Sequence, residues 1–420
     1  MVFISLSAIF SFIVGRCVNL FHNEAMVTER KQSVANSNQS ILEKRRKFFP
    51  QCLYHAFQVP FFVERAETHF YFCPNGIKHT DLYNNVCHLG HSDPHVLRAV
   101  SEAYSTININ TRYLTPSLTN YASHLHNYIP KGFKILFTNS GSESNDLALQ
   151  IAIAVLAQKN LSIGAFEKSY HGTTFLCQQA SHLTPTGVVQ SRKTQINLCF
   201  FSADENKSTL ISKPDVKAFI LEPIQGVAGN VEISKEWMQA IRKHVDVMIC
   251  DEVQTGFGRS GGTFWAFEKS DIVPDIITCG KPIANGYPMG ACIFREELEK
   301  FLPPFYFNTF GGNSAACAVA KVVLEQIEDK DIIRHSEEMG LFLKERLIVL
   351  GDKIERITGT GLFIGIHFRK GINVRNVVEM LKEKNIIVGI GYNDVLRIKP
   401  PMTVNRESLA HFVDTLRVIV

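Results

Sequence analysis

The sequence predicts an α/β fold with a mostly parallel central sheet. Short apolar runs rich in β-branched residues alternate with stretches of helical pattern. Several of these runs end directly in a polar or charged residue, which is typical of parallel strands whose carboxyl ends form a ligand-binding edge. At 420 residues, 45% of them hydrophobic, the chain is long enough for one large domain and a smaller one.

The charge and cysteine content exclude several classes of protein. The chain has 44 basic and 40 acidic residues, and a net charge of +4 is too small to favour a nucleic-acid partner. Its ten cysteines are scattered, form no Cys-x-x-Cys pair and in part lie within apolar runs. This pattern indicates buried thiols in a reducing compartment rather than disulfides or a zinc site, so we expect no metal.

The N-terminal stretch 1–47 is expected to be an extension or targeting segment that is poorly ordered. Its first 20 residues include an apolar run that no positive charge precedes and that is too short to span a bilayer comfortably. The sequence leaves two interpretations open, an organelle transit segment or an artefactual upstream start before Met26. We therefore expect a mitochondrial or cytoplasmic protein without stable membrane insertion.

The elements that precede the first α/β unit are less clearly marked. Helices are predicted over His95–Tyr104 and Ser117–Ile129. The histidines at 88, 91 and 95 lie in a loop that contains glycine and proline, and this context favours loop structure over a metal site.

The first α/β unit contains a candidate phosphate site. Lys134–Thr138 is predicted to be a buried strand, and Asp146–Leu156 continues as an apolar helix. Between them, Ser140–Glu143 fits the Ser-x-x-Glu capping box, and Gly141 lets the backbone approach a ligand closely. The helix N-terminus then suits an anion such as a phosphate, although a plain helix cap explains the motif equally well.

The second strand is expected over Leu161–Phe166 and leads to Tyr170. An aromatic side chain at this point is suited to stacking on a flat cofactor ring, with ordinary packing as the alternative. Residues 178–213 are predicted to be irregular.

Three further strand ends carry charged residues. Val216–Leu221 ends in Glu222, and Val245–Cys250 ends in Asp251, with a helix over Lys235–His244 between them. A short run at Ile276 and Ile277 leads through a glycine to Lys281. Five strand ends thus bring a phosphate site, an aromatic ring, two carboxylates and a lysine to one edge of the sheet.

This set of groups matches the needs of pyridoxal phosphate (PLP). A partly desolvated Lys281 has a lowered pKa and can form a Schiff base with the cofactor. Asp251 follows an apolar run, so its carboxylate would pair strongly with the protonated pyridine nitrogen. Lys281 would then also move the proton at the substrate α-carbon.

Over roughly residues 50–420 the chain resembles the class III, fold-type I, PLP-dependent aminotransferases. The matching stretches are Asn139–Asp146, Tyr170-His-Gly, Glu222-Pro-Ile-Gln-Gly, Asp251–Arg259, Gly280-Lys281 with Asn285–Pro288, and Phe307–Asn313. The resemblance implies a large PLP-binding domain with the parallel sheet over 93–305. It also implies a smaller α+β domain formed by 48–92 and 306–420.

The resemblance also implies roles for single residues. Lys281 carries PLP, Asp251 pairs with the ring nitrogen, and Gln254 reaches the ring hydroxyl. The phosphate is bound by Gly141 and Ser142 and, across a homodimer with shared active sites, by Thr309 of the neighbouring subunit. The full implied cofactor set is Ser140, Gly141, Ser142, Tyr170, His171, Glu222, Asp251, Gln254, Lys281 and Thr309.

Within the family, the chain resembles the alanine–glyoxylate aminotransferase 2-like group in the stretches Asn84–His91, Asn108–Leu114, Gly361–Gly365 and Lys399–Met402. That group includes phospho-lyases acting on ethanolamine phosphate and phosphohydroxylysine. Arg397, before Lys399-Pro-Pro-Met402, favours an aminotransferase that binds an amino-acid carboxylate and passes the amino group to a 2-oxo acid. Arg112 favours a substrate phosphate and therefore a lyase. Thr173, Thr174 and Pro282 depart from the usual pattern, and the segments 178–213 and 367–376 are short, which leaves the substrate open.

The sequence disfavours two other classes of protein. A pseudoenzyme that keeps the fold for dimeric interaction is disfavoured because Lys281, Asp251 and Thr309 are all present. A nicotinamide-binding protein is disfavoured because no Gly-x-Gly-x-x-Gly follows an early strand.

Overall fold

The computed structural model describes residues 37–53, 55–156, 162–184, 187–188, 197–205 and 207–420. Its contacts divide the chain into two compact units, residues 1–65 with 71–79 and residues 66–70 with 80–420. The predicted domain boundaries at 92 and 305 both fall within the second unit and stay a prediction.

The first unit contains a helix where the sequence analysis expected a poorly ordered tail. Residues 37–48 are helical, and Gln39 donates a hydrogen bond to Glu43 one turn later, at 3.0 Å. Leucine, glutamate, lysine and arginine are good helix formers, and this explains why so polar a stretch is helical. Beyond the helix, Phe61 contacts the rings of Phe57, Tyr71 and His79. The apolar run of residues 1–20 lies outside the described residues.

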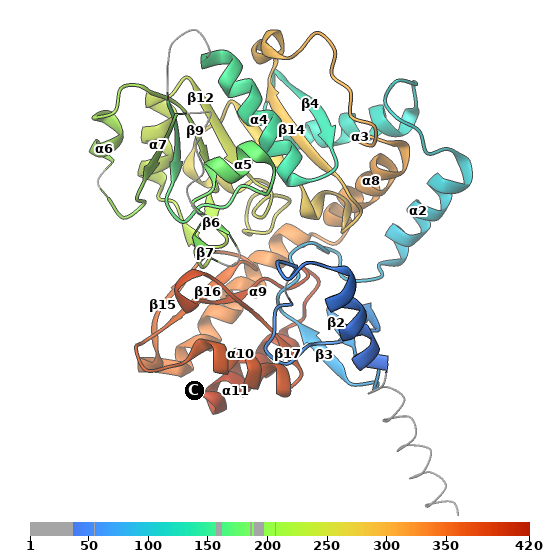
Figure 1. Ribbon diagram of the computed structural model, residues 1–420, viewed down its shortest axis with the longest axis vertical. Helices are drawn as coiled ribbons and strands as arrows, with labels where there is room; N and C mark the ends of the chain where they lie inside the picture. The colour runs from blue at the N-terminus through green and yellow to red at the C-terminus, as the bar shows by residue number, and fades with distance from the viewer. Residues whose placement is uncertain (1–36, 54, 157–161, 185–186, 189–196, 206) are drawn as a thin grey trace, which may run out of the picture. The chain divides into compact units, whose positions relative to one another are not determined.

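The second unit is built on a seven-stranded sheet (Figure 1). In spatial order its strands are β4 (Phe133–Thr138), β14 (Gly290–Arg295), β13 (Ile276–Cys279), β12 (Val247–Asp251), β9 (Val216–Leu221), β5 (Ser162–Phe166) and β8 (Leu198–Phe201). Only β14 runs against the others, since its pairings with β13 and β4 are antiparallel and the other pairings are parallel. The predicted mostly parallel sheet is confirmed.

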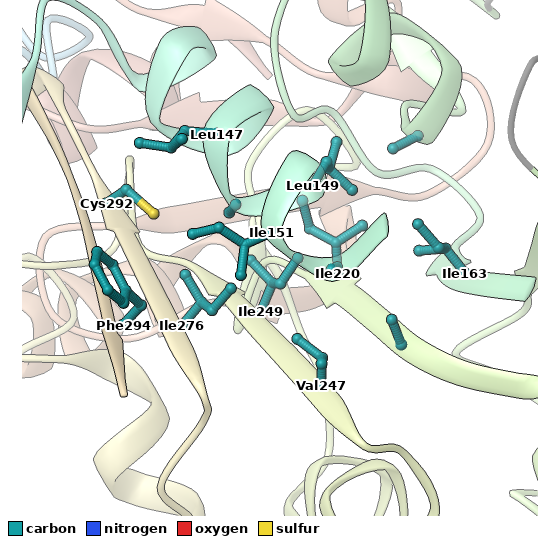
Figure 2. Close-up of a cluster of buried hydrophobic side chains, with 14 of the residues drawn as sticks. Leu147, Leu149, Ile151, Ile163, Ile220, Val247, Ile249, Ile276, Cys292 and Phe294 are labelled. Carbon is teal, nitrogen blue, oxygen red and sulfur yellow. The ribbon is translucent and has the colours of Figure 1, made fainter. Parts of the chain in front are cut away.

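Helix α4 (Gly141–Leu156) covers one face of this sheet and forms the centre of its core. Ile151 of α4 points toward the side chains of Ile276 and Ile249 on the strands, as Figure 2 shows. Ile249 of β12 is fully buried beneath the helix. A core site of this kind loses about 2–5 kcal/mol of folding free energy when isoleucine is replaced by alanine, because a cavity remains.

The remaining helices surround the sheet and a second, smaller sheet. They are α2 (Pro94–Thr106), α3 (Pro116–Leu125), α5 (Phe175–Ala180), α6 (Ser208–Ile211), α7 (Lys235–His244), α8 (Ser314–Asp329), α9 (Ile332–Leu347), α10 (Val374–Glu383) and α11 (Arg406–Ile419). In the part of the chain that the structure describes, the 3-10 helices are η1 (His126–Tyr128), η2 (Ala266–Ser270), η3 (Lys281–Ala284), η4 (Glu296–Phe301), η5 (Ile348–Lys353) and η6 (Tyr392–Asp394). Within the described residues, no helix is both long and apolar enough to cross a bilayer.

The second sheet is antiparallel and lies beside α9, α10 and α11 in Figure 1. Its order is β15 (Ile354–Thr358), β16 (Ile364–Phe368), β19 (Leu396–Ile398) and β18 (Gly389–Ile390). The other strands are β1 (Arg65–Glu67), β2 (Phe70–Phe72), β3 (Lys78–Asp81), β6 (Leu183–Thr184), β7 (Gly187–Val188), β10 (Ile224–Gln225), β11 (Val231–Glu232) and β17 (Ile386–Ile387). Thr80 and Asp81 of β3 pair in parallel with β17.

Several predicted boundaries shift. Helix α2 begins at Pro94 because the Asp93 side chain caps it by accepting from two backbone N–H groups. The helix predicted over Ser117–Ile129 is α3 followed by the 3-10 turn η1. The stretch 178–213, predicted to be irregular, includes β8 and α6, while its residues 185–186, 189–196 and 206 lie outside the described part, as does Leu161.

Candidate functional site

A pocket of about 280 Å³ lies at the carboxyl ends of the parallel strands. It lies in the second unit and receives residues that follow β4, β5, β9, β12 and β13. Nine of the predicted site residues line it: Ser140, Gly141, Ser142, Tyr170, His171, Glu222, Asp251, Gln254 and Lys281. The structure thus brings together the five strand ends that the sequence analysis assigned to one edge.

Asp251 is held in place by three hydrogen bonds. It is the last residue of β12, whereas the sequence placed it directly after the strand, and its side chain is only 4% exposed. Its Oδ2 accepts from Asn145 Nδ2 and contacts His171 Nδ1, both at 2.8 Å, and its Oδ1 accepts from the Val253 N–H at 3.1 Å. His171 Nε2 is buried and has no hydrogen-bond partner among the described residues. A buried carboxylate with this support is a rigid acceptor for a cationic N–H.

The N-terminus of α4 presents backbone donors to the pocket. The N–H groups of Gly141 and Ser142 have no acceptor within the described residues, as expected for the first turn of a helix. A side chain at position 141 would collide with Val253, since a Cβ there would lie 2.5 Å from Val253 Cγ1. Glycine therefore allows the turn to approach the loop after β12 and leaves the donors open to an anion.

Only half of the predicted capping box forms. Ser140 Oγ accepts from the Glu143 N–H at 3.2 Å, as predicted. Glu143 Oε2 does not return to Ser140, because it accepts from the Asn139 N–H and from Asn308 Nδ2. The glutamate instead ties the turn after β4 to the segment before α8.

Glu222 is a buried carboxylate whose pKa is raised to about 7. Burial is the main cause; His171 opposes the rise and Asp251 adds to it. Its two oxygens accept from the N–H groups of Tyr170 and Gly226, both at 3.0 Å. The side chain thus joins the loops after β5 and β9 at the wall of the pocket.

Lys281 begins η3, directly after Gly280. Burial lowers the pKa of its amine, Asp251 and Glu222 act to raise it, and Arg397 lowers it further. Its backbone φ of 35° lies in the left-handed region, which a lysine rarely adopts. Such strain is typical of functional sites, where the surrounding structure enforces it.

The predicted site residues do not include three residues that contact the site: Asn85, Asn145 and Lys399. Gln254 Oε1 accepts from Asn85 Nδ2 at 2.9 Å and from Lys399 Nζ at 3.3 Å. Asn145 supports Asp251 as described above. Asn145 lies within the matched stretch Asn139–Asp146, one turn into α4, so its position on the helix face toward β12 was available as a signal. Asn85 and Lys399 also lie within stretches that resemble the family, but their contacts with Gln254 join segments distant in the sequence, which no local pattern indicates.

Three predicted residues do not line the pocket of this chain. Arg397 is buried, and its guanidinium donates to the carbonyls of Gly226 and Ile390 and to the Tyr83 hydroxyl. Arg112 is exposed and lies over the ring of Phe307 at 4.5 Å. Thr309 is exposed. Their roles toward cofactor or substrate stay predictions.

The histidines at 88, 91 and 95 each contact a neighbouring polar side chain. His91 Nε2 contacts Asp81 Oδ2 at 2.7 Å, and the pKa of His91 is raised to about 9, since the hydrogen bond and charge of Asp81 outweigh the cost of burial. His88 Nδ1 accepts from Arg259 at 3.1 Å, and His95 contacts Asp93, the cap of α2, at 3.4 Å.

Comparison with known proteins identifies the family. The profile of Aminotransferase class-III matches residues 54–420. The chain belongs to the class III aminotransferase family. It is 31% identical over 435 residues to ethanolamine-phosphate phospho-lyase homolog 1 of Caenorhabditis elegans, covering 90% of this chain and 93% of that protein. It is 29% identical over 454 residues to the mitochondrial alanine–glyoxylate aminotransferase 2 of Homo sapiens, covering 93% and 87%.

Solved structures of the family share the fold. A phospholyase from Arthrobacter, solved in complex with phosphoethanolamine, superposes with a TM-score of 0.83 at 24% identity, covering 90% of this chain and 98% of that one. Ornithine aminotransferase of Toxoplasma gondii gives a TM-score of 0.82 at 23% identity, covering 91% and 95%. At these identities the likeness shows the fold, which is the predicted fold type I of PLP-dependent enzymes.

PLP is the cofactor of this family, and the pocket fits it. The free N–H groups of Gly141 and Ser142 suit its phosphate. The rigid acceptor Asp251 suits its ring nitrogen, and the pocket-lining Lys281 has the amine that covalent attachment would require. Together these groups place an anion site, an anionic acceptor and an amine around one cavity, as the chemistry of the cofactor requires.

Proposed function

We propose that the protein is a PLP-dependent aminotransferase that moves an amino group from an amino acid or amine to a 2-oxo acid. The observation that carries this proposal is the unneutralised charge of Arg397. The hydrogen-bond partners of its guanidinium among the described residues are neutral oxygens, and its buried Nε has no partner there. A buried cation without a carboxylate is costly, so an anionic substrate group would stabilise it.

Different residues of the pocket would bind different parts of the cofactor. Gly141 and Ser142 would bind the phosphate, and Thr309 of a second subunit would complete that site. Asp251 would accept from the ring N–H, with Asn145 and His171 fixing the carboxylate. The aromatic ring of Tyr170 lines the pocket and would stack on the cofactor, and Gln254 would reach its ring hydroxyl.

Lys281 would move the proton at the substrate α-carbon. When bound, PLP supplies an electron sink for the negative charge that develops at that carbon. Burial favours the neutral amine of Lys281, which can accept the proton and return it at another atom. The Arg397 guanidinium would fix the substrate carboxylate and so orient the bond to be broken.

A phospho-lyase is the second candidate. The nematode relative is named an ethanolamine-phosphate phospho-lyase homolog, and it matches nearly the full length of this chain. In this case Lys281 would remove the same proton, and the substrate would lose phosphate from the β-carbon. The exposed Arg112 would then be a candidate for the substrate phosphate.

We further propose a homodimer with shared active sites. The segment after α2 and the segment before α8 lie side by side, since the Ser314 N–H donates to Ile109 O and the Ala315 N–H to Asn108 Oδ1. Exposed apolar side chains on these segments are Ile107, Tyr113, Leu114, Phe305, Phe307 and Phe310. Thr309 lies within this patch, so a second copy seated there would bring Thr309 toward another pocket.

The compartment is proposed to be mitochondrial or cytoplasmic. The human and Arabidopsis thaliana relatives are named as mitochondrial proteins. Import of the full chain into isolated mitochondria, with loss of N-terminal residues, would support the first location.

The reaction is tested by two assays on the PLP-loaded protein. The first offers amino donors with pyruvate or glyoxylate and measures the new amino acid. The second offers ethanolamine phosphate or phosphohydroxylysine and measures inorganic phosphate. We expect a new amino acid without phosphate release, and a raised KM for the carboxylate-bearing donor in Arg397→Met. Phosphate release without amino transfer would overturn the aminotransferase proposal in favour of the lyase.

A further inference from the structure

Gln254 lies where three distant parts of the chain meet. It follows β12, lines the pocket and is largely buried. Asn85 comes from the loop after β3, and Lys399 directly follows β19. Both side chains reach the same atom, Gln254 Oε1, at 2.9 and 3.3 Å.

These contacts determine which way the Gln254 amide points. Asn85 donates to this atom through its NH₂ group, and the Lys399 amine donates to it through an N–H, so the atom between them acts as the acceptor oxygen. The NH₂ group of Gln254 is then turned away from them. It lies over Gly226, where a Cβ would stand only 2.3 Å from Gln254 Nε2, and it has no acceptor among the described residues.

Burying the Lys399 amine costs free energy, although among the described residues the amine makes only one hydrogen bond, to the Gln254 oxygen. The side chain is 4% exposed and lies over the rings of Tyr83 and Phe363, at 4.9 and 5.6 Å. Burial lowers the pKa of its amine well below the ordinary value, and the charges of Arg397, Lys281 and Arg259 lower it further, against the opposing charge of Glu222. An apolar side chain would fill this space at lower cost, so the amine is retained for its donor function.

We propose that Asn85 and Lys399 are positioning residues that fix the Gln254 amide with its Nε2 donor facing the cofactor site. The proposal rests on the proposed function, in which Gln254 reaches the ring hydroxyl of PLP. It assigns the two side chains to cofactor binding, although neither faces the pocket wall. A glutamine released from them could turn by 180° and present its oxygen to the ring oxygen, a repulsive contact between two acceptors.

The test measures PLP dissociation constants and visible spectra of purified Lys399→Met, Asn85→Ala, Gln254→Ala and the double variant Gln254→Ala/Lys399→Met. Lys399→Met keeps the apolar stem between the two rings. It should weaken PLP binding by about fivefold, the worth of one hydrogen bond, and shift the visible absorption maximum in the direction seen for Gln254→Ala. In the double variant the effect of Lys399→Met should vanish, because no amide is left to orient.

A matched control removes another buried lysine. Lys382 lies on α10, bonds to Glu379 and does not line the pocket, so Lys382→Met should leave affinity and spectrum unchanged. If Lys399→Met fails to fold, Asn85→Ala carries the same test, with Gln254→Ala/Asn85→Ala as the double variant. Effects of Lys399→Met and Gln254→Ala that add fully, or no effect of either orienting substitution, would overturn the proposal. If Gln254→Ala itself leaves PLP binding unchanged, the assignment of Gln254 in the proposed function is wrong instead.

Discussion

Replacing Asp251 by asparagine should weaken cofactor binding and also destabilise the empty protein. The carboxylate accepts from Asn145 Nδ2, His171 Nδ1 and the Val253 N–H, and therefore faces donors on both oxygens. An asparagine has one oxygen and one NH₂ group. In either orientation its NH₂ group meets a donor that the carboxylate satisfied.

The size of each effect follows from these contacts. A hydrogen bond to a charged partner contributes about 1.5–3 kcal/mol, so its loss at the ring nitrogen raises the PLP dissociation constant about 10- to 150-fold. The unsatisfied donor costs the empty protein about 1–3 kcal/mol of unfolding free energy. The proton transfer at the substrate α-carbon should slow further, since a neutral pyridine ring is a weaker electron sink.

Equilibrium binding of PLP and urea unfolding of the empty protein measure the two effects separately. Asp246→Asn is a suitable control because Asp246 is exposed and directly precedes the same strand. Unchanged PLP affinity in Asp251→Asn would refute the assignment of Asp251 to the ring nitrogen. Weaker binding in the control as well would show that the loss is not specific to the site.

Three further outcomes are expected. Because burial raises the folded-state pKa of Glu222 to about 7, above its ordinary value of 4.5, the stabilising contribution of this group is present below pH 4.5 and is lost as the pH rises through 7. The unfolding free energy of the empty protein should therefore fall less steeply across this window in Glu222→Gln, and an equal slope would contradict the argument. Gly172→Ala should impair PLP binding, since φ is 128° and a Cβ would lie 2.4 Å from Ser142 Oγ, whereas Gly371→Ala, with φ of 103° and open space around it, should cost stability alone. Mixing Lys281→Ala and Thr309→Ala chains should restore activity above that of either variant if subunits share sites, and no restoration in a mixed dimer would contradict sharing.

The sequence predicted the elements and residues whose signals are local. Asp251 and Lys281 are predictable because each comes at the end of an apolar run, and parallel strands bring such positions to one edge. The direction of the Arg397 guanidinium was not predictable, since it depends on the carbonyls of Gly226 and Ile390, which are distant in the sequence or on another strand. The contact of Lys399 with Gln254 was not predictable either, because these two residues are also distant in the sequence.

At the N-terminus a helix forms where the sequence predicted a poorly ordered tail. Residues 37–48 are largely polar and charged, and this composition alone predicts a tail. Composition reports whether a segment can form a core, whereas helix formation depends on backbone propensity, which leucine, glutamate, lysine and arginine favour.

The central claim is that Lys281 carries PLP, and borohydride reduction tests it most directly. The reagent fixes the link between cofactor and lysine, and peptide mapping by mass spectrometry then locates the label. We expect the label on Lys281 and a loss of visible absorbance in Lys281→Ala. Lys399 is the natural competitor, because burial lowers the pKa of this amine as well. A label on Lys399, or a Lys281→Ala protein that keeps its colour, would contradict the account.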